Sequence, residues 1–191
     1  MEDENLLIQH AVQGDSSAFN ELLGAHESQM YAICYRMCGN YNDAQDCLQE
    51  AMLRVYKALP TFKSQSSFST WLYRIAMNAC LDELRRKKNR PNTSLDALVG
   101  EGWSPKSDME TPDEHVIRKE RTRVLHAAIQ ELPEEMRSAI VLRDIQGFSY
   151  EEIADMLNVS IGTIKSRISR GREKLREKIM TNAELFGKKR V

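Results

Sequence analysis

Cations and small polar side chains alternate along residues 161–180, and together they could bind a polyanion. At about 100° per residue of a helix, one side carries groups that can hydrogen-bond to base edges. Lysine and arginine on either side of them could neutralise phosphates. The polar side holds Ser166, Ser169, Arg170 and Glu173, and the flanking cations are Lys165, Arg167, Arg172 and Lys174. This pattern predicts a helix that lies in a groove of duplex nucleic acid.

The apolar residues of the same segment predict how that helix is held. Ile164, Ile168, Gly171, Leu175 and Ile179 recur at steps of three and four and so share one buried stripe.

A second, shorter helix is expected just before it. Ser149 and Glu152 have the spacing of a capping box, Asn158 suits a left-handed helix end, and Ser160 can cap the next helix. Two helices joined by so tight a turn predict a helix-turn-helix. The alternative is a solvated amphipathic helix, which such charge runs usually form, and the capped helix in front favours DNA binding.

The net charge of -1 hides four blocks of opposite sign. Residues 1–60 carry a net -6 and residues 61–90 a net +5, followed by -5 over residues 91–135 and +5 over residues 136–191. Two basic blocks indicate two surfaces for a polyanion, and the acidic ones indicate a surface for another partner.

The first basic block contains a mixed stripe on a predicted helix. Its members are Trp71, Arg74, Asn78, Leu81 and Arg85, and the helix ends in RRKKNR at residues 85–90. Flat aromatic rings beside cations suit unpaired bases, which stack on the rings while the cations follow the backbone. The alternative is that Trp71 and Tyr73 belong to the core and that the basic run is a solvated helix end. This stretch alone leaves both interpretations open.

The periodicity predicts an all-α fold, because no run of alternating β-branched residues occurs. Ser16, Asn42 and Ser69 are expected to cap helices. The expected buried side of the helix after Asn42 consists of Ala44, Cys47, Leu48, Ala51, Met52, Val55 and Tyr56. A stretch rich in Pro, Gly, Ser and Asp has the composition of a flexible linker. We therefore expect two small helical domains over residues 1–90 and 113–182, a linker over residues 91–112 and a basic tail over residues 183–191.

Metal, cofactor and membrane roles are not expected. Cys34, Cys38, Cys47 and Cys80 contain no CxxC pair, and no histidine has a ligand spacing with them. They are interpreted as small buried residues. No apolar run approaches the ~20 residues of a membrane span, and no signal peptide opens the chain, which predicts a cytoplasmic protein without membrane insertion. No paired carboxylates or nucleophile–base set indicate an enzyme.

Four blocks of the chain resemble a known family. DAQDCLQEAMLRVYKAL, FSTWLYRIAMNACLDELRRKK, LPEEMRSAIVLRDIQGFSYEEIA and GTIKSRISRGREKLR, in this order and spacing, look like a bacterial sigma factor of the extracytoplasmic-function (ECF) group. The resemblance implies a sigma-two-like helical bundle and a sigma-four-like helix-turn-helix domain. It also implies binding to core RNA polymerase through its β′ clamp and β flap, to promoter DNA and to an anti-sigma factor. Gln45, Met52 and Ser169 depart from the residues usual in the family.

The resemblance assigns roles residue by residue. The residues that match the clamp-binding helix are Asp46, Gln49, Glu50 and Arg54. Those that match, or lie beside, the parts that hold the melted minus-ten strand are Lys63, Ser64, Gln65, Ser66, Ser67, Phe68, Ser69, Trp71, Tyr73, Arg74, Asn78, Arg85, Arg86, Lys87 and Lys88. The minus-thirty-five set is Arg143, Tyr150, Thr163, Lys165, Ser166, Arg167, Ser169, Arg170 and Arg172. Arg170 is the first choice for a base contact, because a guanidinium can hold guanine O6 and N7 together.

A helix-turn-helix regulator that acts without stable binding to core polymerase is the other hypothesis. Its C-terminal half would look similar, but it leaves the block from Phe62 to Lys88 unexplained.

Overall fold

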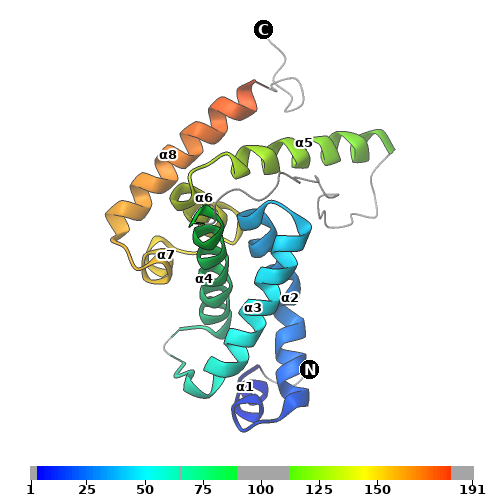
Figure 1. The fold of residues 1–191 in the computed structure, drawn as a ribbon, viewed down its shortest axis with the longest axis vertical. Coiled ribbons are helices and arrows are strands. Elements are labelled where there is room, and N and C mark those ends of the chain that lie inside the picture. The colour runs from blue at the N-terminus through cyan, green and yellow to red at the C-terminus, as the bar shows by residue number, and fades with distance from the viewer. Residues whose placement is uncertain (1–3, 65, 90–111, 182–191) are drawn as a thin grey trace. The chain divides into compact units, whose positions relative to one another are not determined.

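The computed structural model describes residues 4–64, 66–89 and 112–181. All regular secondary structure in these residues is helical (Figure 1). The first part contains α1 (Glu4–Val12), α2 (Ser16–Cys38), α3 (Tyr41–Ala58), the 3-10 turn η1 (Leu59–Thr61) and α4 (Phe68–Asn89). The second contains α5 (Pro112–Gln130), α6 (Glu134–Ile140), the π-helical turn η2 (Val141–Ile145), α7 (Tyr150–Leu157) and α8 (Ile161–Met180). The all-α prediction is confirmed.

The chain divides into two compact units, one built on α1 to α4 and one on α5 to α8. Arg36–Tyr41, at the end of α2, is grouped with the second unit. Gln65, the predicted tail and all but the last residue of the predicted linker lie outside the described residues. The predicted domain limits therefore stay predictions.

The first unit buries the apolar faces of its helices. On α3 the buried residues follow helical spacing through Ala44, Leu48, Ala51 and Val55, as the sequence predicted. Tyr56 was also expected inside, but its side chain is 64% exposed and its ring meets the edge of Phe19, with 5.4 Å between ring centroids. The prediction for Tyr56 was wrong, because the apolar stripe does not extend that far around the helix.

Three predicted helix caps in this unit were wrong by one or two residues. Asp15, not Ser16, caps α2, and its Oδ1 accepts the backbone N–H of Ser17 at 2.8 Å. Ser67, not Ser69, caps α4 by accepting the N–H of Thr70 at 3.1 Å. Asn42 lies inside α3, which begins at Tyr41. Each segment offers two or more capping side chains within a few residues, and sequence spacing does not choose between them.

The helix-turn-helix of the second unit has the predicted caps. Ser149 Oγ accepts the N–H of Glu152 at 3.2 Å, and the Glu152 carboxylate accepts the N–H of Ser149 at 2.9 Å, which closes a capping box. Asn158 ends α7 in the left-handed region with φ 52°. Ser160 Oγ accepts the N–H of Thr163 at 3.1 Å and begins α8. The turn between the two helices is therefore fixed at both ends.

The buried stripe of α8 sets which side of that helix faces solvent. Ile164, Ile168, Gly171 and Leu175 are buried, in agreement with the prediction, whereas Ile179, predicted in the same stripe, is only half-buried. At Gly171 the helices α6 and α8 approach closely, since a Cβ built there would lie 2.8 Å from Ile140 Cγ1. Ile140 is itself 2% exposed and has little room to move. Only glycine fits this crossing without a shift of the Ile140 side chain or of one helix.

Gly171→Ala is expected to destabilise the chain by about 1–3 kcal/mol through overpacking, in spite of the higher helix propensity of alanine. Urea and thermal denaturation would measure the change.

Gly162→Ala is the matched control on the same helix, since its Cβ would meet nothing closer than Ser160 Oγ at 3.8 Å. It should leave stability unchanged or raise it by about 0.5–1 kcal/mol. Equal stability for the two variants would contradict the tight crossing.

Candidate nucleic-acid interface

The predicted polar side of α8 lies at the surface. Lys165, Ser166, Ser169 and Arg170 are exposed, while Ile164 and Ile168 on the opposite side are buried. Thr163 and Arg167 are half-buried at the border between the two sides. The face that was expected to meet DNA is therefore open to a ligand.

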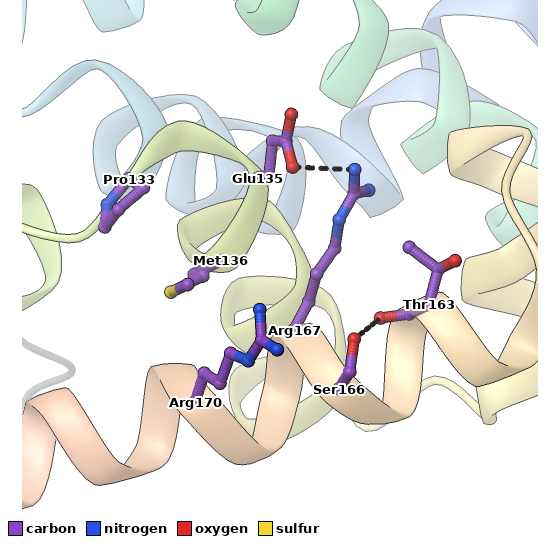
Figure 2. A pocket seen from close by; sticks show the side chains of 7 residues that line it. All are labelled: Pro133, Glu135, Met136, Thr163, Ser166, Arg167 and Arg170. Atoms are coloured by element: carbon purple, nitrogen blue, oxygen red, sulfur yellow. Dashed lines mark hydrogen bonds and ion pairs between the residues drawn. The ribbon is translucent and has the colours of Figure 1, made fainter.

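Arg167 and Arg170 both line a pocket of about 200 Å³, but they differ in their partners. Figure 2 shows Arg167 reaching from α8 to Glu135 at the start of α6, with 2.8 Å between Nη2 and Oε2. Arg170 makes no hydrogen bond or ion pair with any residue in the described part of the chain. Arg170 is therefore available to an outside acceptor, whereas Arg167 braces two helices.

Arg172 is also balanced by an acid of its own unit. Its Nε donates to Asp144 Oδ2 at 3.0 Å, and this hydrogen bond raises the pKa of the Arg172 guanidinium above its usual value. The pair is largely exposed, so it contributes little to stability. Its main effect is to reduce the net positive charge near α8.

Two further cations gather around the ring of Tyr150, at the start of α7. The Arg143 guanidinium lies 4.7 Å from the ring centroid and the Lys165 ammonium 5.9 Å from it. Arg143 also donates to the carbonyl oxygen of Phe148 at 2.6 Å. The ring and the carbonyl thus hold Arg143 in place before any ligand arrives, and the ring brings Lys165 beside it.

In the first unit, the mixed stripe on α4 splits into a buried and an exposed part. Arg74 and Asn78 lie one helical turn apart and are exposed. Trp71 is 8% exposed and Phe68 3%, and their rings pack with Phe62 at centroid distances of 5.1 Å and 5.6 Å. Phe68 and Trp71 were predicted beside unpaired bases, but in this structure they belong to the core and offer no open ring face.

Tyr73 likewise points inward. Its hydroxyl hydrogen-bonds to Gln29 Oε1 and lies 3.1 Å from His26 Nδ1. Burial, helped by the negative charge of Glu4, raises the pKa of Tyr73 to about 12. The hydroxyl is therefore a protonated internal group rather than a surface contact, as the alternative interpretation of the stripe had it.

The loop before α4 is polar and exposed. Lys63, Ser64, Ser66 and Ser67 all lie at the surface, and Ser64 has a left-handed φ of 54°. A non-glycine residue in this region is uncommon and stores some backbone strain. The Ser67 hydroxyl lies 3.0 Å from that of Ser69 and 2.7 Å from that of Thr70, which ties the loop to the helix start.

The basic end of α4 carries less free charge than its sequence indicates. Arg86 forms two hydrogen bonds with Glu83, at 2.7 and 2.8 Å, and Lys87 pairs with Asp43 of α3. Arg85 lies 3.7 Å from Asp82. Three of the four cations at residues 85–88 are thus paired within the unit.

The predicted partner face of α3 is exposed at Asp46, Gln49 and Glu50. Arg54 does not stand apart from it, because its Nε donates to Glu50 and its Nη1 to Asp82 of α4, each at 2.7 Å. The hydrogen bond with Asp82, followed by that with Glu50, raises the pKa of Arg54. Arg54 therefore links the acidic face of α3 to α4.

Two exposed apolar residues of α3 were missed as surface candidates. Leu53 is 54% exposed, and Leu53 and Tyr56 lie one and two turns along the helix from Gln49. Their spacing from Asp46 and Gln49 could have placed them on the same face. An acidic face with apolar residues beside it suits a protein partner better than nucleic acid.

No helix among the described residues is both long and apolar enough to cross a membrane.

Comparison with known proteins agrees with the two units. Residues 22–90 match the family Sigma-70 region 2, and residues 122–175 match the family Sigma-70, region 4. The chain is 39% identical over 178 residues to the ECF RNA polymerase sigma factor SigW of Bacillus subtilis, covering 90% of this chain and 94% of that protein. It is 34% identical over 180 residues to the ECF RNA polymerase sigma-E factor of Escherichia coli K12, covering 92% and 94%.

Two solved structures have a similar fold. CnrH, in complex with the cytosolic domain of CnrY, has a TM-score of 0.65 and 25% identity, covering 94% of this chain and 99% of CnrH. The sigma factor RpoE of Bartonella quintana, in complex with the anti-sigma factor NepR, has a TM-score of 0.68 and 23% identity, covering 85% and 96%. The chain belongs to the ECF group of RNA polymerase sigma factors. Members of this family are transcription initiation factors rather than enzymes.

Tyr73→Phe and Arg74→Ala test whether Tyr73 contributes to the interior of the first unit and Arg74 to its DNA-binding surface. Tyr73→Phe should lower stability by about 1 kcal/mol, because it removes a part-buried hydrogen bond, and should leave binding of single-stranded DNA to the polymerase complex unchanged. Arg74→Ala should weaken strand binding and change stability by less than about 0.5 kcal/mol. Thermal melts and fluorescence anisotropy would measure the two effects, and weaker strand binding by a stably folded Tyr73→Phe would return Tyr73 to the interface.

Proposed function

We propose that this sigma factor reads its promoter with two separate surfaces, one for duplex DNA and one for an unpaired strand. The observation that carries this proposal is that a helix of each unit presents exposed polar groups that have no hydrogen bond or ion pair within the described residues. These groups are Arg170 on α8, and Arg74 and Asn78 on α4. Each set lies opposite a buried apolar stripe, so packing fixes its direction. Neither surface carries an arrangement suited to bond cleavage.

The acidic face of α3 is the proposed contact with the β′ clamp of core polymerase. Asp46, Gln49 and Glu50 supply charge and hydrogen bonds, while Leu53 adds apolar area beside them. The β flap is the proposed partner of the second unit. Without these contacts the chain has no means of reaching a melted strand, because opening a duplex requires the larger assembly.

The minus-ten strand is proposed to follow the loop at Lys63–Ser67 and the exposed side of α4. Arg74 and Asn78 would contact an unstacked base and its backbone, and Lys88 would hold phosphate upstream. Capture of an extruded base offsets the few kcal/mol that unstacking costs. Phe68, Trp71 and Tyr73 support this surface from within, because their burial sets the direction of α4.

The minus-thirty-five element is proposed to bind α8 in its major groove. Arg143, Tyr150 and Lys165 form a cluster suited to phosphate at one side. Ser166, Ser169 and Arg170 face base edges, with Arg170 the specific contact. Arg167 and Arg172 act mainly as positioning residues, because Glu135 and Asp144 already hold them.

An anti-sigma factor is the proposed regulator. Both similar solved structures are complexes with a second protein, and in one of them the sigma factor RpoE is bound to the anti-sigma factor NepR. A pull-down of the tagged chain from uninduced cells should recover such a protein in an amount equal to that of the tagged chain. Recovery of polymerase alone would contradict this mode of control.

Duplex opening tests the proposal as a whole. The purified chain with core polymerase should open promoter-like DNA, detected by permanganate reactivity of unpaired thymines, and the chain alone should not. Asp46→Lys should abolish opening because it inverts a charge on the clamp-binding face. Glu27→Lys makes the same charge change at an exposed position of α2, and this variant should open DNA normally. Tight, specific duplex binding without any polymerase-dependent opening would instead support a regulator of the helix-turn-helix class.

Arg170→Ala tests base reading. Loss of a bidentate guanine contact is worth ~1–3 kcal/mol, so transcription from the cognate promoter should fall about 5- to 150-fold. The same variant should discriminate less at one base pair of the minus-thirty-five element. Arg176→Ala removes an exposed charge two turns further along α8 and should reduce binding equally at all sequences. A uniform loss for Arg170→Ala would reassign Arg170 to phosphate.

A further inference from the structure

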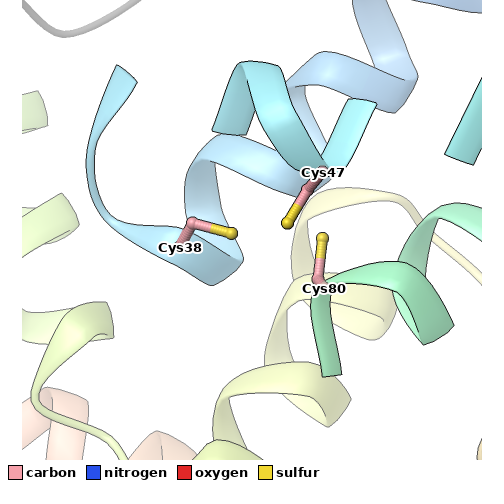
Figure 3. A group of neighbouring side chains, drawn as sticks. All are labelled: Cys38, Cys47 and Cys80. Atoms are coloured by element: carbon pink, nitrogen blue, oxygen red, sulfur yellow. The ribbon is translucent and has the colours of Figure 1, made fainter. Parts of the chain in front are cut away.

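Three of the four cysteines converge on one point of the helical bundle. Cys38 is the last residue of α2, Cys47 lies on α3 and Cys80 on α4. Their three Sγ atoms all lie within 4.8 Å of one another, and Figure 3 shows the side chains directed toward a common centre. None of the three forms a disulfide among the described residues. Cys34, one turn earlier on α2, is buried but is not part of this group.

The helices themselves fix this arrangement. Cys47 is 2% exposed and Cys80 is 0% exposed, so neither thiol can turn away without breaking core packing. Cys38 is carried by the same continuous helix as Met30 and Ile33, which are fully buried in the bundle. Its sulfur is therefore directed by α2 and not by a loop.

We propose that Cys38, Cys47 and Cys80 form a binding site for one thiophilic d10 cation of the Zn²⁺ class. Thiolates are soft ligands that favour such ions. In tetrahedral coordination with Zn–S bonds of about 2.3 Å, neighbouring sulfurs lie about 3.8 Å apart, so the sulfurs need to approach by no more than about 1 Å. Binding replaces three S–H protons by three Zn–S bonds and releases three protons to solvent.

The fourth coordination position would be taken by water or by a small thiol. No histidine or carboxylate in the described ranges joins the group. Three protein ligands with one open position are enough for a Zn²⁺ site. Cys38 is only partly buried, which gives the ion a path to the open position.

Binding would join the two functional helices of the first unit. Cys47 follows Asp46 directly, and Cys80 lies two residues after Asn78. An ion held by α2, α3 and α4 would therefore fix the polymerase-binding and strand-binding surfaces relative to each other. This site does not depend on the proposed function and can be tested without DNA or polymerase.

The test is Zn²⁺ binding to the full-length chain after reduction and removal of metal by a chelator. Competition with a chromophoric chelator should give one ion per chain. Co²⁺ as a substitute should give a thiolate-to-metal charge-transfer band in the near ultraviolet. Saturating Zn²⁺ should raise the melting temperature by roughly 5 °C or more, because the ion binds only the folded bundle.

Single cysteine-to-alanine variants identify the ligands. Cys38→Ala, Cys47→Ala and Cys80→Ala should each lower Zn²⁺ affinity roughly tenfold or more. Cys34→Ala is the matched control and should bind as the unaltered chain does. Circular dichroism checks that each variant is folded, and Cys38→Ala, at the end of α2, tests the site with the least disturbance of the core. Equal Zn²⁺ binding by the unaltered chain and the triple variant, or equal losses for Cys34→Ala and Cys47→Ala, would overturn the proposal.

Discussion

The close crossing of α6 and α8 is the constraint on which the second unit depends. Gly171 lets the backbone of α8 approach Ile140, and this contact fixes both the depth and the rotation of the helix. The side chains on opposite faces of a helix have fixed directions relative to one another. The rotation that buries Ile164 and Ile168 on one side therefore exposes Ser166, Ser169 and Arg170 on the other. The direction of the polar side chains thus follows from apolar packing, and no polar contact needs to specify it.

The first unit follows the same logic with one addition. The aromatic cluster of Phe62, Phe68 and Trp71 anchors the start of α4, so that Arg74 and Asn78 face outward one and two turns later. Arg54 then connects α3 to α4 through Glu50 and Asp82. The proposed polymerase-binding surface and the proposed strand-binding surface therefore share one electrostatic link.

Much of this arrangement could be predicted from the sequence, because it rests on local rules. The capping box at Ser149, the left-handed Asn158 and the stripe of α8 each depend on residues within one or two helical turns. The sequence could not predict that Trp71 and Tyr73 point inward, because a stripe of aromatic and cationic residues fits the edge of a core as well as a surface. The pairing of Lys87 with Asp43 and of Arg172 with Asp144 joins residues on separate helices, and no spacing rule finds such contacts. The meeting of Cys38, Cys47 and Cys80 escaped for the same reason, because ligand motifs are recognised only where they are close in sequence.

The acidic residues that pair with cations of α8 affect how this protein finds its site among other DNA. Attraction to any stretch of DNA grows with the number of phosphates that a protein neutralises, and the chromosome offers an enormous excess of irrelevant sites. Glu135 and Asp144 already pair with the guanidinium groups of Arg167 and Arg172, which reduces the attraction of these two groups to phosphates in general. A helix built in this way is less readily sequestered by bulk DNA, and a larger share of its binding free energy comes from the few groups that recognise sequence.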